Sequence, residues 1–112
     1  MKGTYLGEFE ELVLLTTAVI QQQGAYGNSV LDEIEVRSDR RVNLSAVHSA
    51  LHRLEKKGFL KSYKGESSGV RGGKRKKLYS ITPYGVKALD DIREMRQDLW
   101  ASIPSVVIDS VK

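Results

Sequence analysis

Apolar positions near the start of the chain recur at the spacing of a helix. From Gly7 to Gln23 they follow one another at three- and four-residue steps, and two leucines widen the stripe, which consists of Phe9, Leu12, Val13, Leu14, Leu15, Val19 and Ile20. This pattern predicts a largely buried first helix. Gly24 is suited to follow the last turn, because glycine tolerates the left-handed backbone conformation found there.

Two further helices are expected in the next part of the chain. The second helix is short, ends near Ser38 and is marked by Val30, Leu31 and Ile34. Ser45 is expected to cap the third helix, because its hydroxyl can accept a hydrogen bond from a free backbone N–H of the first turn. That helix then runs from about Ala46 to Lys57, and its apolar side carries Val47, Leu51 and Leu54.

A basic hairpin is expected after the third helix. Residues 60–64 and 77–81 contain the aromatic and branched side chains typical of strands. Residues 65–76 lie between them and are rich in glycine, serine and cations, with Val70 as the one apolar side chain. The sequence therefore predicts two strands joined by a basic loop, an arrangement called a wing.

The last part of the sequence predicts a long fourth helix. Thr82 is a suitable cap, and Pro83 fits the first helical position, where its missing N–H costs nothing. Pro104 is expected to end or kink the helix, and a stripe at roughly coiled-coil spacing lines one side of it: Val86, Leu89, Ile92, Met95 or Arg96, Leu99 and Ile103. The expected fold is mainly α with a small β-hairpin, a winged helix-turn-helix of order α-α-α-β-β-α. Residues 1–82 would form the winged-helix domain, and residues 83–112 a C-terminal helix and tail.

Charge is distributed unevenly along the 112 residues. Residues 53–77 hold ten Lys or Arg and two Glu, a net charge of +8, which leaves −4 for the rest of the +4 chain. Like charges this close repel one another by roughly 1 kcal/mol per near pair in water, so the cluster favours a polyanionic partner over a merely soluble loop. The acidic remainder would supply surfaces for protein contacts.

The predicted helix-turn-helix and wing together indicate a surface for double-stranded DNA. The third helix has short side chains near its start and cations toward its end, which suits insertion into a major groove. In the wing, Gly72 and Gly73 would let the backbone approach a phosphate or the minor groove. The expected DNA-binding residues are Ser45, Ala46, His48, Ser49, His52, Arg53, Lys56, Arg71, Gly72, Gly73, Lys74, Arg75 and Lys76.

The stripe on the fourth helix needs a partner, because a lone helix projecting from a small core would expose it to water. We therefore expect a homodimer, with Phe9, Leu89, Ile92, Leu99, Trp100 and Ile103 as its dimerisation residues.

No cysteine is present, so disulfides and thiolate metal sites are excluded. Acidic residues precede the first apolar run, unlike a signal peptide, and no apolar stretch has membrane-spanning length, so a cytoplasmic protein without membrane contact is expected.

Other readings of the same residues remain open or fail. A plain helical bundle would also show a solvated third helix, and an effector-sensing or protein-interaction module with weak DNA binding is the alternative function. His48 and His52 lie one turn apart, but two ligands leave a metal site incomplete. A phosphate-binding loop would need glycine at position 68 and Ser or Thr at position 75, where Ser68 and Arg75 stand. No catalytic constellation is apparent, so neither an enzyme nor a cofactor is expected.

Five segments in this order resemble the PadR-type transcriptional regulators. They are residues 6–12 (LGEFEEL), 26–27 (YG), 51–58 (LHRLEKKG), 72–77 (GGKRKK) and 79–85 (YSITPYG). The resemblance covers about residues 5–90 and includes a short C-terminal helix typical of one subfamily. It implies a dimer held by that helix on a pseudo-palindromic operator near a promoter, usually a repressor released by a small effector.

The sequence departs from this family at the start of the third helix. The family commonly has tyrosine followed by proline there, at positions that correspond to His48 and Ser49, so a contact made by that tyrosine is not carried over. Trp100 lies near the end of the fourth helix, where the resemblance implies a platform for a small aromatic effector. The alternative, which is commoner for a lone aromatic residue on such a helix, is an anchor between the subunits.

Overall fold

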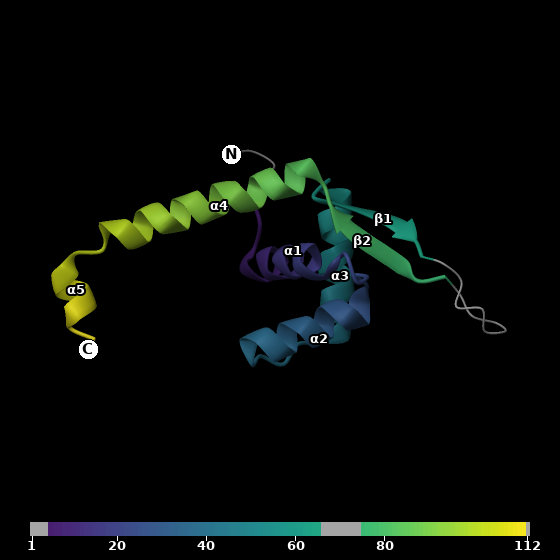
Figure 1. Ribbon diagram of the computed structural model, residues 1–112, viewed down its shortest axis with the longest axis horizontal. Coiled ribbons are helices and arrows are strands. Elements are labelled where there is room, and N and C mark those ends of the chain that lie inside the picture. Colours follow the sequence, from purple (N-terminus) through teal and green to yellow (C-terminus); the bar gives the residue numbers. More distant parts are fainter. Residues whose placement is uncertain (1–4, 66–74, 112) are drawn as a thin grey trace.

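The computed structural model describes residues 5–65 and 75–111, and its order of elements matches the predicted winged helix-turn-helix with one short helix added (Figure 1). The element bounds are α1 Glu8–Ile20, α2 Gly27–Ser38, α3 Leu44–Lys56, β1 Leu60–Lys64, β2 Lys77–Ile81, α4 Pro83–Ser102 and α5 Ser105–Asp109. The first three helices and the hairpin form the body. Helix α4 leaves this body as a long arm and carries α5 at its far end (Figure 1).

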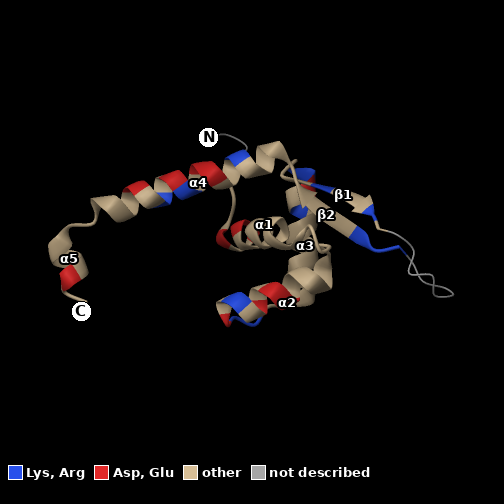
Figure 2. Cartoon of the chain, in the orientation of Figure 1, with Lys and Arg blue, Asp and Glu red and all other residues tan. Residues whose placement is uncertain are grey.

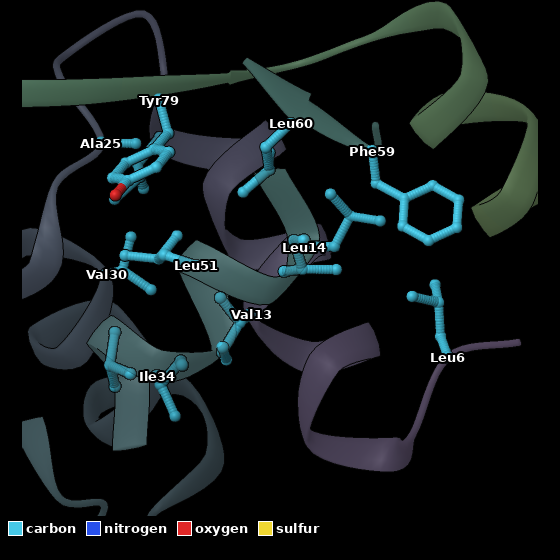
Figure 3. Packing of buried hydrophobic residues seen from close by; sticks show 14 of the residues in the cluster. Leu6, Val13, Leu14, Ala25, Val30, Ile34, Leu51, Phe59, Leu60 and Tyr79 are labelled. Carbon is cyan, nitrogen blue, oxygen red and sulfur yellow. The ribbon is translucent and has the colours of Figure 1, made fainter. Parts of the chain in front are cut away.

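The core lies where the first three helices meet the hairpin. Each of these helices directs one apolar stripe inward, and side chains of the three helices and both strands lie together there with Leu6, Ala25 and Phe59 from the connecting segments (Figure 3). Val13, Leu51 and Phe59 are completely buried. Burying an aliphatic or aromatic side chain of this size contributes about 1.5–3 kcal/mol, so this cluster supplies the main stabilisation of the body.

Helix α1 differs from its prediction along one side. Leu15 and Val19 belong to its apolar stripe, yet their side chains are 44% and 50% exposed. Thr17 is fully buried instead, and its hydroxyl donates to the carbonyl oxygen of Val13 at 2.8 Å. The hydrogen bond to a backbone acceptor offsets the desolvation cost of the buried hydroxyl, so threonine can take a core position that hydrophobicity alone would not assign to it.

The ends of the helices follow from local chemistry. Gly24 and Gly58 have φ values of 109° and 86°, in the left-handed region that glycine adopts without strain. The prediction that Ser45 caps α3 is wrong. Asn43 is the cap, because its side-chain oxygen accepts hydrogen bonds from the backbone N–H groups of Ser45 and Ala46.

The hairpin has the predicted strand bounds and is anchored to the helices by its second strand. Leu60 pairs with Ile81 and Lys64 with Lys77 in an antiparallel register. The backbone N–H of Tyr79 donates to the carbonyl of Ala25 at 2.9 Å. The N–H of Ile81 donates to the side chain of Gln21 at 2.9 Å. These bonds hold the strand next to the segment that joins α1 to α2.

Helix α4 begins as the sequence predicts. The Thr82 hydroxyl accepts from the N–H of Gly85 at 3.0 Å, and Pro83 occupies the first turn. Gly85 packs so tightly that a Cβ atom there would lie 2.4 Å from the carbonyl oxygen of Phe59. The helix ends at Ser102 next to Pro104. No helix within the described ranges 5–65 and 75–111 has both the length and the apolar content needed to span a membrane.

Candidate nucleic-acid interface

The outward face of α3 contains every residue of this helix that the sequence proposed for DNA. Buried positions alternate with exposed ones at helical spacing, and Val47, Ala50, Leu51 and Leu54 face the core. The exposed residues are Ser45, Ala46, His48, Ser49, His52, Arg53 and Lys56. A helix that is anchored on one side and exposed along the other can enter a major groove without disturbing its packing.

The first turn of α3 is small and internally bonded. Ser45, Ala46 and Ser49 carry short side chains, so little bulk separates the backbone there from an approaching surface. The Ser45 hydroxyl donates to the side-chain oxygen of Asn43. Hydroxyls are both donors and acceptors, so Ser45 still has lone pairs available for an external donor.

His48 lies against the start of α2. A Cβ atom built on Gly27 would lie 2.3 Å from a ring carbon of His48, so only glycine leaves room for the imidazole in this position. A shallow cleft of about 200 Å³ opens beside it and is lined by Tyr26, Gly27, Asn28, His48, Lys76, Lys77 and Tyr79. The cleft therefore joins the helix-turn-helix to the basic end of the hairpin.

The described end of the hairpin is basic and contacts the helices. Arg75, Lys76 and Lys77 are all exposed, and Figure 2 shows this end of β2 in blue. The Lys76 ammonium lies 4.1 Å from the centre of the Tyr26 ring. Lys77 pairs with Glu55 of α3 at 3.2 Å. Four other residues proposed for the wing lie outside the described residues: Arg71, Gly72, Gly73 and Lys74.

Arg53 has a partner that the sequence did not identify. Its Nε donates to Glu10 of α1 at 2.9 Å, and the Lys57 ammonium reaches the same carboxylate at 2.9 Å. Glu10 is only 7% exposed as a residue, although it is a charged side chain in the first turn of α1. The available signal was the four-residue spacing of Arg53 and Lys57, which places two cations on one side of α3.

Several carboxylates at this surface have shifted pKa values. Burial by itself raises the pKa of Glu10, but hydrogen bonds from Lys57, Arg53 and the Gly7 N–H outweigh it, so the net shift is downward. The Ser62 hydroxyl is the main cause of the lowered pKa of Glu55, and Lys77 adds to it. Both carboxylates are held in their charged forms and neutralise part of the basic surface.

A second surface lies between α1 and α4. A groove of about 670 Å³ is lined by Glu11, Leu15, Ala18, Ile81, Pro83, Val86, Lys87, Leu89, Asp90, Arg93 and Arg96. Arg96 crosses it to pair with Glu11 at 2.8 Å. The predicted dimerisation residues divide along this surface. Phe9, Leu89 and Ile92 pack partly against the core, Ile103 is half-buried, and Leu99 and Trp100 are 62% and 69% exposed.

His48 and His52 are both exposed on α3. In the part of the chain that the structure describes, no group of three His, Asp or Glu side chains is arranged to hold a metal ion.

Comparisons with known proteins give the same architecture. The model of the transcriptional regulator PadR-like family matches residues 16–91. A transcriptional regulator from Clostridium thermocellum is 24% identical, with a TM-score of 0.66 over 96% of this chain and 100% of that one. A PadR-like transcriptional regulator from Bacillus cereus is 19% identical, with a TM-score of 0.65 over 92% of this chain and 89% of that one. A PadR family transcription regulator from Clostridium difficile is 24% identical, with a TM-score of 0.59 over 91% of this chain and 98% of that one. No curated protein matches the sequence.

Proposed function

Because this chain belongs to the PadR-like family of transcriptional regulators, we propose that it is a cytoplasmic repressor that binds double-stranded DNA sequence-specifically as a homodimer. In this proposal residues 1–82 bind DNA, and residues 83–112 hold the two subunits together. The operator is pseudo-palindromic, because a two-fold dimer presents the same surface twice.

The observation that carries the proposal is the continuity of two surfaces, the exposed face of α3 and the basic end of the hairpin. Contact between Lys76 and Tyr26 brings the end of β2 beside the start of α2, and His48 lies in the same cleft. The proposed DNA-binding residues are Ser45, Ala46, His48, Ser49, His52, Lys56, Arg75 and Lys76, together with Arg71, Gly72, Gly73 and Lys74 on the sequence argument alone.

The two parts of this surface are assigned different tasks. Ser49, His48 and His52 present donors and acceptors to base edges in the major groove, which is where base pairs are distinguishable. Lys56, Arg75 and Lys76 contact phosphates, which sets register and affinity without reading sequence. Arg53 lies on the same face of α3, but its guanidinium already pairs with Glu10.

Dimerisation is assigned to the apolar side of α4 and the adjacent groove. Leu99 and Trp100 are exposed on the α4 arm, and the exposed Leu15 of α1 lines the groove at the base of this arm. A second copy would bury these side chains, and stable interfaces bury about 800 Å² per partner. The proposed dimerisation residues remain Phe9, Leu89, Ile92, Leu99, Trp100 and Ile103.

Trp100 supports a regulatory role in this proposal. Its ring is the most exposed aromatic surface on α4, and at the dimer axis it can stack on a flat aromatic effector. Binding there would change the relative placement of the two subunits and so release the operator. Quenching of Trp100 fluorescence by flat aromatic compounds, together with loss of DNA binding, tests this role.

Selection of bound fragments from random duplex DNA tests the whole proposal. We expect an inverted repeat whose halves are separated by about one helical turn, roughly 10 base pairs. The logarithm of the affinity for the selected fragment should fall linearly with the logarithm of salt, by about 0.9 per phosphate contact. Absence of duplex binding at low ionic strength would refute the proposal and favour the protein-interaction or effector-sensing module.

The wing is tested separately. Replacing Arg71, Lys74 and Arg75 together by glutamine should lower both the affinity and the salt slope, because three cations are lost from the proposed phosphate contact. Undiminished promoter binding would remove the wing from the interface and favour the same alternative module.

A further inference from the structure

Glu10 is a buried carboxylate that ties the first helix to the third. Its side chain is 9% exposed and accepts from Arg53 Nε at 2.9 Å and from Lys57 Nζ at 2.9 and 3.1 Å. The backbone N–H of Gly7 also donates to it, at 3.2 Å. Four donor–acceptor contacts therefore converge on this one carboxylate of α1, three from the end of α3 and one from the residue before α1.

The two cations hold α3 at points one turn apart. Arg53 and Lys57 are separated by four residues, so their side chains leave the same side of the helix, roughly 5–6 Å apart at their Cβ atoms. The buried side chains Val47, Ala50, Leu51 and Leu54 already fix α3 on the core, and the two ion pairs add to this restraint on its rotation and tilt. Because the carboxylate is buried, salt screens this link less than an exposed pair.

The side chains proposed to contact base edges lie on the same helix; His52 directly precedes Arg53, and the other two lie about one turn before it. Ser49 precedes Arg53 by four residues, and His48 precedes it by five. Hydrogen bonds weaken steeply as their angles depart from linearity, so a small rotation of α3 would misalign side chains that contact base edges. Contacts to phosphates tolerate such a shift better, because they depend mainly on charge and distance.

We propose that Glu10 is a positioning residue for base recognition, and that Arg53 and Lys57 act through Glu10 and not on the DNA phosphates. This inference rests on the proposed DNA-binding function. It differs from the simple expectation that every cation on α3 contacts DNA, since it removes two of them from the phosphate interface. The expected signature is a loss of discrimination between sequences at an unchanged salt slope.

Glu8 provides a matched control in the same turn of α1. Its carboxylate pairs with Arg40 at 2.7 Å, in the connection between α2 and α3, and its side chain is 67% exposed. Glu8→Gln removes the same charge from the same turn without touching the anchors on α3. Any effect that comes only from the total charge of α1 should therefore appear in both variants.

The experiment measures full-length wild type, E10Q and E8Q on two duplexes by fluorescence anisotropy over a series of salt concentrations. One duplex is the best fragment selected by the wild type from random DNA, and the other is a scrambled duplex of equal composition. We expect E10Q to bind the selected duplex about tenfold more weakly, comparable to one mismatched base pair, with scrambled-duplex affinity and both salt slopes unchanged. E8Q should keep the wild-type ratio between the two duplexes.

Arg53→Gln is a second variant, to be used if E10Q does not fold. In this variant Glu10 keeps its ion pair with Lys57. We expect it to reduce discrimination without changing the salt slope. A slope that falls by about 0.9 in R53Q would show a direct phosphate contact and overturn the inference. The inference would also be overturned if E10Q bound both duplexes more weakly by the same factor, or if its affinity for both duplexes were unchanged. If the wild type binds no duplex, the proposed function itself fails, and that result is distinct from these outcomes.

Discussion

Lys76 at the start of the second strand lies over the aromatic ring of Tyr26, the residue that precedes α2, with its ammonium 4.1 Å from the ring centre. Cation–π contacts at exposed sites contribute about 0.5–1 kcal/mol, enough to bias the hairpin toward the helices without locking it. The contact also directs the charge of Lys76 toward the cleft beside His48.

The contact between Lys76 and Tyr26 predicts different effects for substitutions of the two residues. K76Q should lower the affinity for duplex DNA and reduce the salt slope by about 0.9, because one phosphate contact is lost. Tyr26→Leu should weaken binding less and leave the slope unchanged, since the charge remains. Anisotropy titrations over a salt series measure both quantities. Lys61→Gln is the control, because Lys61 is exposed at the end of the hairpin away from Lys76, and an equal slope change in that variant would contradict the assignment of Lys76.

Asn43 should prove to be the cap of α3 in stability measurements. Asn43→Ala removes the acceptor for two backbone N–H groups and should destabilise the protein by about 1 kcal/mol. For a chain of this size, that change lowers Tm by about 4–8 °C. Ser45→Ala should cost less, because the Ser45 side chain donates to Asn43 and does not cap the helix itself. Thermal unfolding by circular dichroism would contradict this account if S45A were the more harmful variant.

Two glycines should respond to alanine in opposite ways. Gly85→Ala places a methyl group against the backbone carbonyl of Phe59, which cannot move away, so we expect destabilisation of about 1–3 kcal/mol. Gly27→Ala meets the imidazole of His48, a side chain that can swing aside. It should therefore keep most of the stability and change DNA binding instead. Urea unfolding and anisotropy separate the two cases, and similar unfolding free energies for both variants would refute the distinction.

Stability should fall in acid partly through Glu10. The pKa of Glu10 in the folded protein lies below its ordinary value of 4.5, because hydrogen bonds from Lys57, Arg53 and Gly7 outweigh the opposing effect of burial. Its charged form thus stabilises the fold above that value, and the contribution is lost as the pH falls through the lowered pKa. E10Q should show a flatter dependence of unfolding free energy on pH in this acidic range. An unchanged profile in E10Q would argue against the link.

Exposed side chains on α4 should control assembly. Leu99→Glu should abolish the dimer at micromolar concentration, because two leucines would each lose about 1.5–3 kcal/mol of burial and two charges would enter the contact. Val36→Glu on α2 is the control, since its side chain is also exposed, at 80%, but lies away from the arm. Sedimentation velocity reports the masses, and a dimeric L99E would place the interface elsewhere.

The sequence by itself determined the elements and their order. Residues 60–64 and 77–81 were assigned to strands with the observed bounds, and Thr82 with Pro83 marked the start of α4, because these signals are local. The exposed face of α3 followed from helical spacing alone. The cap of that helix was misassigned to Ser45, because Asn43 and Ser45 have similar local chemistry and only the backbone path distinguishes them.

Only the tertiary structure decided which charges meet. Glu10 and Arg53 are 43 residues apart in the chain, and no local pattern relates them. The packing of α1 against α3 brings the carboxylate to both Arg53 and Lys57, and the packing of α2 against α3 places His48 over Gly27. Helical periodicity in the sequence shows which side chains of a helix face the core. Which residue of another helix a side chain contacts depends on the angle between the two helices, and that angle is set by the packing of the whole core.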